Sequence, residues 1–179
     1  MKNTGRIALI LYGLVVGEAA SQAALRYFGD WGAGLSVVNG QTICTAMTVS
    51  NPIAQGQLFQ IIRMRVEGHP IIGLNFIFEG QNFAGVIPIS LLVGGRQFAF
   101  QARPVGSRGG LAVFSQNQAE VRIINEAVIA MTQAQMPIFV VFRPANNIPE
   151  AIFSVSGIQA AIQEMNACAV REGMLDRRP

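Results

Sequence analysis

Apolar and polar residues alternate in short runs along most of this chain of 179 residues. Alternation with a period of two is typical of strands that bury one face of a sheet. Glycine, proline and asparagine separate the runs, as expected for strands joined by tight turns. We therefore predict strands at residues 31–38, 41–49, 58–66, 71–78, 86–93, 96–102, 111–115, 138–142 and 151–155.

Two dipeptides predict the tightest turns of the sheet. Asn39-Gly40 lies between the first two runs, and Gly94-Gly95 lies between two later ones. Two-residue hairpin loops place their central residues at positive φ, which asparagine and glycine adopt readily. Both pairs of runs should therefore form antiparallel hairpins.

Two segments show helical periodicity instead. Residues 119–134 carry apolar side chains at spacings of three and four, and Pro137 ends this stripe. Ser156, followed three residues later by Gln159, forms a capping box that predicts a helix to about Ala169. The apolar face of that helix consists of Ile158, Ala161, Ile162, Met165 and Cys168.

These elements predict a mainly β fold: an antiparallel β-sandwich or barrel-like domain with a C-terminal helix and a second short helix. The sequence has no internal repeat, low-complexity segment or linker, so residues 24–179 should form a single β-rich domain with a frayed C-terminal tail. That length allows a substantial core.

The first residues have the pattern of a secretory signal peptide. Lys2 and Arg6 form a positive region, residues 7–16 are an apolar run, and a small-residue stretch ends at Ala23. This order matches the charged, apolar and cleavage regions of such a peptide. We expect residues 1–23 to be removed and the mature protein to be periplasmic or secreted.

The alternative is an uncleaved membrane anchor. A spanning helix needs about 20 apolar residues, and Glu18 interrupts the run before that length is reached. No later run is apolar and long enough, so we expect no stable membrane span in the mature chain.

Cys44 and Cys168 are the two cysteines of the chain. An even number without metal-ligand spacing is typical of a disulfide in an exported protein. A Cys44–Cys168 bond would tie an early strand to the last helix. The alternative is two unpaired or intermolecular thiols.

Charged residues make up 13% of the chain and hydrophobic residues 51%, which favours a folded domain over a disordered one. The net charge of +3 arises from scattered basic residues, almost all of them arginines. No basic run is interleaved with aromatic residues, so we expect no nucleic-acid partner.

Four arginines form our candidate interaction surface for a protein or envelope partner. Arg63 and Arg65 occupy alternate positions of one predicted strand, which predicts that this face of the strand is exposed to solvent. Arg103 and Arg108 lie in a glycine-rich loop, which has no phosphate-binding pattern.

No catalytic or metal-binding motif stands out in the sequence. His69 is the only histidine and precedes Pro70 in a predicted turn, which argues against a hydrolytic triad and a zinc site. The acidic residues fall mostly at turns or helix faces rather than as a pair suited to glycoside chemistry. We therefore expect no cofactor, no metal and no enzymatic activity.

Both ends of the predicted domain resemble a known family. The sequence FGDW at residues 28–31 and the sequence FSVSGIQAAI at residues 153–162, followed by Cys168, are similar to motifs of the invasion-associated locus B family. These are secreted or periplasmic proteins of alphaproteobacteria. The resemblance implies an exported β domain and, in pathogens, a role in host-cell invasion and virulence. No catalytic residues carry over from it.

The chain departs from that family in its cysteines. Members often carry a cysteine shortly after the tryptophan and a further pair in mid-chain, whereas residues 32–38 and the middle of this chain have none. The resemblance is therefore to a divergent member or a sister family.

The leading hypothesis is an exported, non-enzymatic interaction protein that binds an envelope or host-cell partner through a sheet face or an exposed edge strand. The alternative is a carrier of a small apolar ligand in a β-barrel cavity, with Met47, Met64 and Met131 in its lining. The third hypothesis, an enzyme, requires several polar groups that converge in one cleft.

Overall fold

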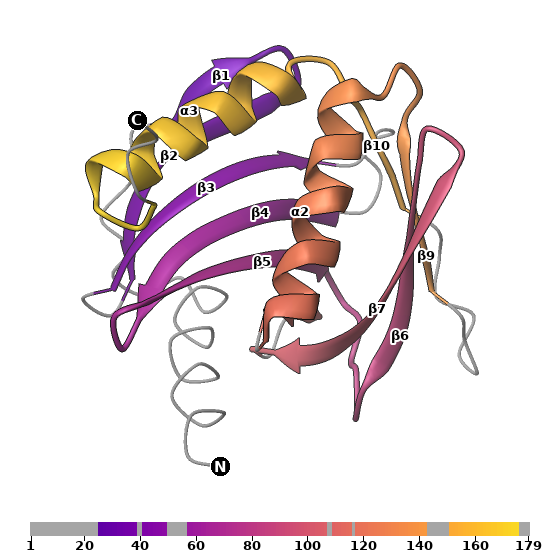
Figure 1. Ribbon diagram of the computed structural model, residues 1–179. Coiled ribbons are helices and arrows are strands. Elements are labelled where there is room, and N and C mark those ends of the chain that lie inside the picture. The colour runs from indigo at the N-terminus through magenta and orange to yellow at the C-terminus, as the bar shows by residue number, and fades with distance from the viewer. Residues whose placement is uncertain are drawn as a thin grey trace.

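The computed structural model describes residues 25–38, 41–49, 57–106, 109–115, 117–142 and 151–175. The described strands form one antiparallel sheet in the order β1-β2-β3-β4-β5-β8-β7-β6-β9-β10 (Figure 1). They are β1 (Arg26–Phe28), β2 (Trp31–Val38), β3 (Gln41–Val49), β4 (Gln57–Val66), β5 (His69–Phe78), β6 (Ile87–Val93), β7 (Arg96–Val105), β8 (Gly110–Phe114), β9 (Ile138–Phe142) and β10 (Ala151–Phe153). The described helices are α2 (Gln118–Gln133) and α3 (Ile158–Arg171).

Strand β7 joins the two halves of the sheet. Residues 96–102 of this strand pair with β6, whereas residues 103–105 pair with β8. In Figure 1 the strands β2–β5 cross the view, and β6, β7 and β9 rise steeply beside them. The sheet therefore curves strongly, and its two halves enclose an inner face.

The sheet does not close, because β1 and β10 remain its edges. The chain after β10 nevertheless contacts the turn between β1 and β2. The Asp30 amide donates to the Ser156 carbonyl oxygen at 3.1 Å, and Trp31 Nε1 donates to the Ser154 carbonyl oxygen at 2.8 Å. The two segments that carry the family resemblance thus meet in space.

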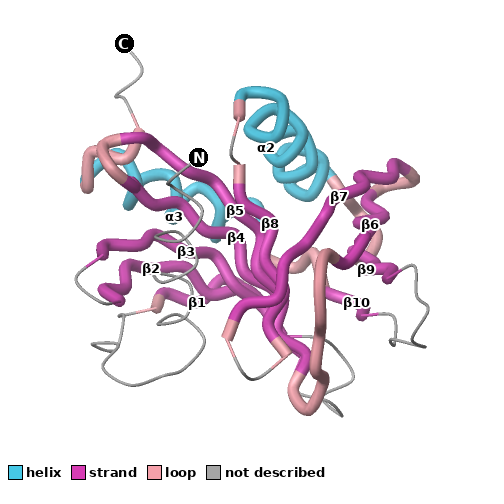
Figure 2. The backbone as a smooth tube through the Cα atoms, turned by 90° about the horizontal axis from the view of Figure 1, so that it is seen from below, coloured by secondary structure: helices cyan, strands magenta, loops and turns pink. Residues whose placement is uncertain are grey.

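Helices α2 and α3 both lie on the inner face (Figures 1 and 2). Helix α3 packs on β2 and β3, and α2 packs on β5 and β6. Helix α2 begins after Asn117, whose side-chain oxygen accepts the Glu120 amide at 3.0 Å. Its buried stripe consists of Ile124, Ala127, Val128, Ala130 and Met131.

The capping box predicted at Ser156 is wrong. The N-cap of α3 is Gly157, which has φ +85° and makes no side-chain cap hydrogen bond. A Cβ at Gly157 would lie 1.5 Å from the Phe28 carbonyl oxygen. Close approach to β1 therefore requires glycine here, and the helix starts from a left-handed residue instead of a serine.

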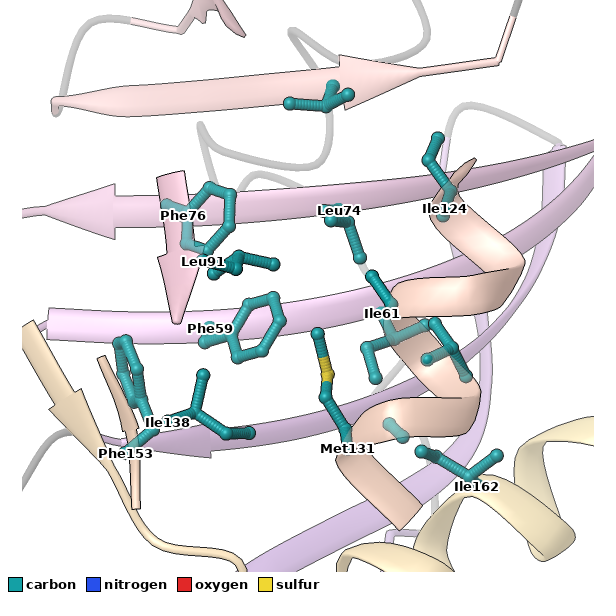
Figure 3. Packing of buried hydrophobic residues seen from close by; sticks show 14 of the residues in the cluster. Phe59, Ile61, Leu74, Phe76, Leu91, Ile124, Met131, Ile138, Phe153 and Ile162 are labelled. Carbon is teal, nitrogen blue, oxygen red and sulfur yellow. The ribbon is translucent and has the colours of Figure 1, made fainter. Parts of the chain in front are cut away.

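Aromatic residues fill the core between the sheet and the helices (Figure 3). The rings of Phe59 and Phe76 stack with centroids 4.8 Å apart, and Trp31 meets Phe59 edge-on at 5.8 Å. Phe153 from β10 lies 5.4 Å from the Phe59 ring. This arrangement joins both ends of the sheet in one apolar cluster.

A second, smaller apolar cluster lies on the outer face of β3–β5. It consists of Ile43, Ile62, Met64, Val66 and Ile71, with Phe114 packed against it. Asn75 lies on the same face and is fully buried. Its Nδ2 donates to Gln60 Oε1 at 2.8 Å, and its Oδ1 has no hydrogen-bond partner.

The prediction of a mainly β, antiparallel, sandwich-like fold with two helices is confirmed, and the barrel-like variant is not realised. The strand ranges agree closely with the predicted ones, with two exceptions. Strand β1 was not predicted, and β7 extends to Val105, so Arg103 lies in a strand that pairs with β8 and not in the predicted loop. The predicted signal peptide at residues 1–23 and the Asn39-Gly40 turn lie outside the described residues. No helix in the described part of the chain is long and apolar enough to cross a membrane.

Candidate interaction site

The predicted disulfide is present. Cys44 on β3 and Cys168 on α3 are bonded, with Cα atoms 5.9 Å apart, and both side chains are fully buried. The bond holds α3 on the inner face of the sheet. Cys44 is also the register partner of Arg63 on β4, so the bond fixes the sheet beside that arginine.

The three candidate arginines that the structure describes do not form one surface. Arg63 lies on the inner face of β4, and Arg65 is exposed beyond it on the same strand. Arg103 is exposed and lies in register with Ala112, which in turn pairs with Asn75 of the outer face. Arg108 lies outside the described residues.

The prediction that Arg63 and Arg65 lie on a solvent-exposed face is wrong for Arg63. Phe59 and Ile61 share the face with Arg63, and both are fully buried beneath the helices. Arg63 itself is half-buried, because α2 and α3 lie over this end of β4.

Two asparagines hold the Arg63 guanidinium. Its Nε donates to Asn166 Oδ1 of α3 at 2.8 Å, and its Nη2 donates to Asn125 Oδ1 of α2 at 3.3 Å. We call these three residues the Arg63 cluster. It links one strand and both helices through a single side chain.

Burial changes the protonation equilibrium of the cluster. Removal from water disfavours the charged form and lowers the pKa of the Arg63 guanidinium to about 10. That pKa is still far above 7, so the guanidinium remains charged at neutral pH. The cluster is a cation with amide partners.

Sequence reasoning missed Asn125 and Asn166. Each directly follows a buried residue of a helical stripe, Ile124 and Met165 respectively. That position at the edge of an apolar face was the available signal. Which strand residue the two asparagines meet depends on how both helices pack.

The methionines proposed to line a ligand cavity are not together. Met131 is buried in the inner core, whereas Met64 belongs to the outer cluster. Met47 lies in register with Gln60 on the outer face. With the sheet open and α2 filling its inner face, the cavity alternative has no structural support.

The structure shows no clustering of groups for metal chemistry in the ranges described. His69 is exposed at the start of β5. No group of three or more His, Cys, Asp or Glu side chains among those residues could hold a metal ion.

Comparisons with known proteins show a likeness of fold. No protein-family model and no curated protein sequence matches the chain. The crystal structure of invasion-associated protein B from Bartonella henselae is similar, with a TM-score of 0.52 over 83% of this chain and 99% of that chain. The sequence identity is 11%, so the likeness establishes a related fold and not membership of a sequence family.

Proposed function

We propose that this is an exported, non-enzymatic interaction protein, periplasmic or secreted, that binds an envelope or host-cell partner at the Arg63 cluster and the adjacent Arg65. The observation that carries the proposal is a half-buried arginine whose charge meets two neutral amides. Buried charges are normally paired with an opposite charge. Among the described residues Arg63 has no such opposite charge, and a cation in this state is suited to receive one from a partner.

Two further observations support this function. The protein of similar fold is described as invasion associated, which fits a protein that acts on a partner outside the cytoplasm. The disulfide and the signal-peptide pattern of the first residues both fit an oxidising compartment.

Export is tested by intact mass of the protein recovered from the bacterial periplasm or medium, with thiol labelling before and after reduction. We expect a chain without residues 1–23 that accepts two labels only after reduction. A full-length chain confined to the cytoplasm would contradict the proposal.

Binding is tested with a photo-crosslinking residue at position 65, in the bacterium that produces the protein. We expect a discrete adduct that is lost in an Arg63→Gln background. The same residue at position 122, exposed on α2, is the matched control. Equal adducts at both positions, or an adduct unaffected by Arg63→Gln, would contradict binding at this site.

A further inference from the structure

The Arg63 guanidinium has unused hydrogen-bonding capacity. A guanidinium has five N–H groups, and Arg63 donates through two nitrogen atoms, Nε and Nη2, to the two asparagines. With one hydrogen bond on each, the remaining N–H groups have no partner in the described ranges. Because Arg63 is half-buried rather than enclosed, part of this donor edge is open to solvent.

No carboxylate of the described residues neutralises Arg63. The acidic side chains that form ion pairs in those ranges contact other arginines, namely Arg26, Arg96, Arg122 and Arg171. Arg65 lies two residues further along β4, roughly 7 Å away along the strand, and adds a second positive charge. The two positive charges of Arg63 and Arg65 therefore favour an anion.

The surroundings of Arg63 are already ordered for binding. The disulfide fixes α3 next to the register partner of Arg63, and Asn166 on that helix orients Nε. Each asparagine accepts through its oxygen and keeps an NH₂ group beside the guanidinium. Little side-chain freedom remains to be lost when an anion arrives, which favours affinity.

We propose that the Arg63 cluster binds a carboxylate group supplied by an acidic peptide segment. This rests on the proposed function and names the chemistry of its partner. The planar fork of a guanidinium matches the two oxygens of a carboxylate, which accept parallel hydrogen bonds. A phosphate presents similar oxygens to a guanidinium and is therefore included as a competing probe in the test.

The direct test follows the Arg63 Nε–H resonance by ¹H–¹⁵N NMR, assigned with Arg63→Lys. The probes are acetate, a blocked tripeptide Gly-Asp-Gly and inorganic phosphate at equal ionic strength. We expect saturable shifts with acetate and the tripeptide, with a dissociation constant on the order of 1 mM, and a weaker response to phosphate. An unchanged Arg63 resonance with both carboxylates would overturn the proposal, as would tighter binding of phosphate.

A second variant places a carboxylate in the site without removing the arginine. Asn166→Asp places an acidic oxygen where Asn166 Oδ1 now accepts from Nε, so the positive charge of Arg63 is neutralised internally while its unused N–H groups stay in place. We expect the affinity for acetate to fall at least about tenfold, which is a loss of about 1.4 kcal/mol of binding, while the melting temperature rises. Gln163→Glu adds the same charge at an exposed position of α3 and should leave acetate binding almost unchanged. Equal acetate binding by Asn166→Asp and the native chain would place the acetate elsewhere.

The same measurements separate the inference from the function it rests on. Acetate binding at Arg63 without a crosslinked partner in cells supports a site for free carboxylates and counts against the interaction function. A partner adduct that depends on Arg63, without any carboxylate response, leaves the function standing and overturns the carboxylate assignment.

Discussion

Helices α2 and α3 cover the same face of one sheet, but they are held there in different ways. Helix α3 is bonded covalently to β3 through Cys44 and Cys168. Its start is fixed by the close approach of Gly157 to β1, and Glu164 on its surface pairs with Arg26 of β1 at 3.1 Å.

Helix α2 has no covalent tie. It is held by its apolar stripe, by the Asn117 cap, and by an exposed pair between Arg96 and Glu126 at 4.0 Å. The Arg63 cluster lies between the two helices, so one of its sides is rigidly fixed and the other depends on packing. This difference predicts that α3 positions the guanidinium and that α2 can adjust to what binds.

The largest effect should come from the disulfide. The bond closes a loop with a sequence separation of 124 residues, and loops of this length contribute about 4–5 kcal/mol in the chain-entropy description. We expect the Cys44→Ala/Cys168→Ala variant to lose about 4 kcal/mol of unfolding free energy, measured by urea denaturation. The variant should be insensitive to reductant, whereas the native protein should fall to a similar stability on reduction. Equal urea midpoints for native and variant chains would show that α3 is held mainly by packing.

The second-largest loss of stability should come from truncating the buried side chain at the centre of the α2 apolar stripe. Met131 is fully buried in the main core, so Met131→Ala should lower the unfolding free energy by about 3 kcal/mol through lost contacts and a cavity. Met136, 57% exposed just after α2, provides the matched control, and Met136→Ala should change stability by less than about 0.5 kcal/mol. Hydrogen exchange should then accelerate in α2 more than in α3. Equal acceleration in both helices would mean that they unfold as one unit.

The two helices also differ in how their first residues are capped, a difference that we expect to contribute about 1 kcal/mol to the unfolding free energy. Asn117 caps α2 through its side chain, whereas Ser156, the residue predicted to cap α3, makes no such bond. Asn117→Ala should cost about 1 kcal/mol, and Ser156→Ala should cost close to nothing, both measured by thermal unfolding. If Ser156→Ala lost as much stability as Asn117→Ala, Ser156 would cap α3 after all, as the sequence predicted.

The capping result shows where sequence reasoning succeeded and where it stopped. The longer strands were predicted near their observed limits because alternation over seven or more residues reports burial of one face, and the shorter ones because turn residues flank a compact apolar run. The three residues of β1 are too few to show a period. The helix after residue 156 was found from its apolar stripe, but its start depends on the approach of Phe28, which no local pattern encodes.

The candidate site was predictable only in part. The sequence identified Arg63 and the Cys44–Cys168 pair, because an arginine within an apolar run and an isolated pair of cysteines are local signals. It placed Arg63 in water, because alternation cannot show which face the helices will cover. The contacts of Asn125 and Asn166 with Arg63 depend on how both helices pack, which the sequence does not show.

The smallest expected effect lies on the surface of α3. Glu164 pairs with Arg26 at 3.1 Å and with Arg171 at 3.3 Å, and its own side chain is only 19% exposed. Glu164→Gln should lower the unfolding free energy by about 0.5–1 kcal/mol, because exposed arginine partners weaken the pairs. Glu126, whose pairs are longer and more exposed, provides the control and should show a smaller change. Since salt screens exposed pairs over about 3 Å at 1 M, most of the Glu164→Gln effect should disappear at that ionic strength. An undiminished loss in high salt would show instead that Glu164 contributes through packing, which would make the tie between α3 and β1 steric rather than electrostatic.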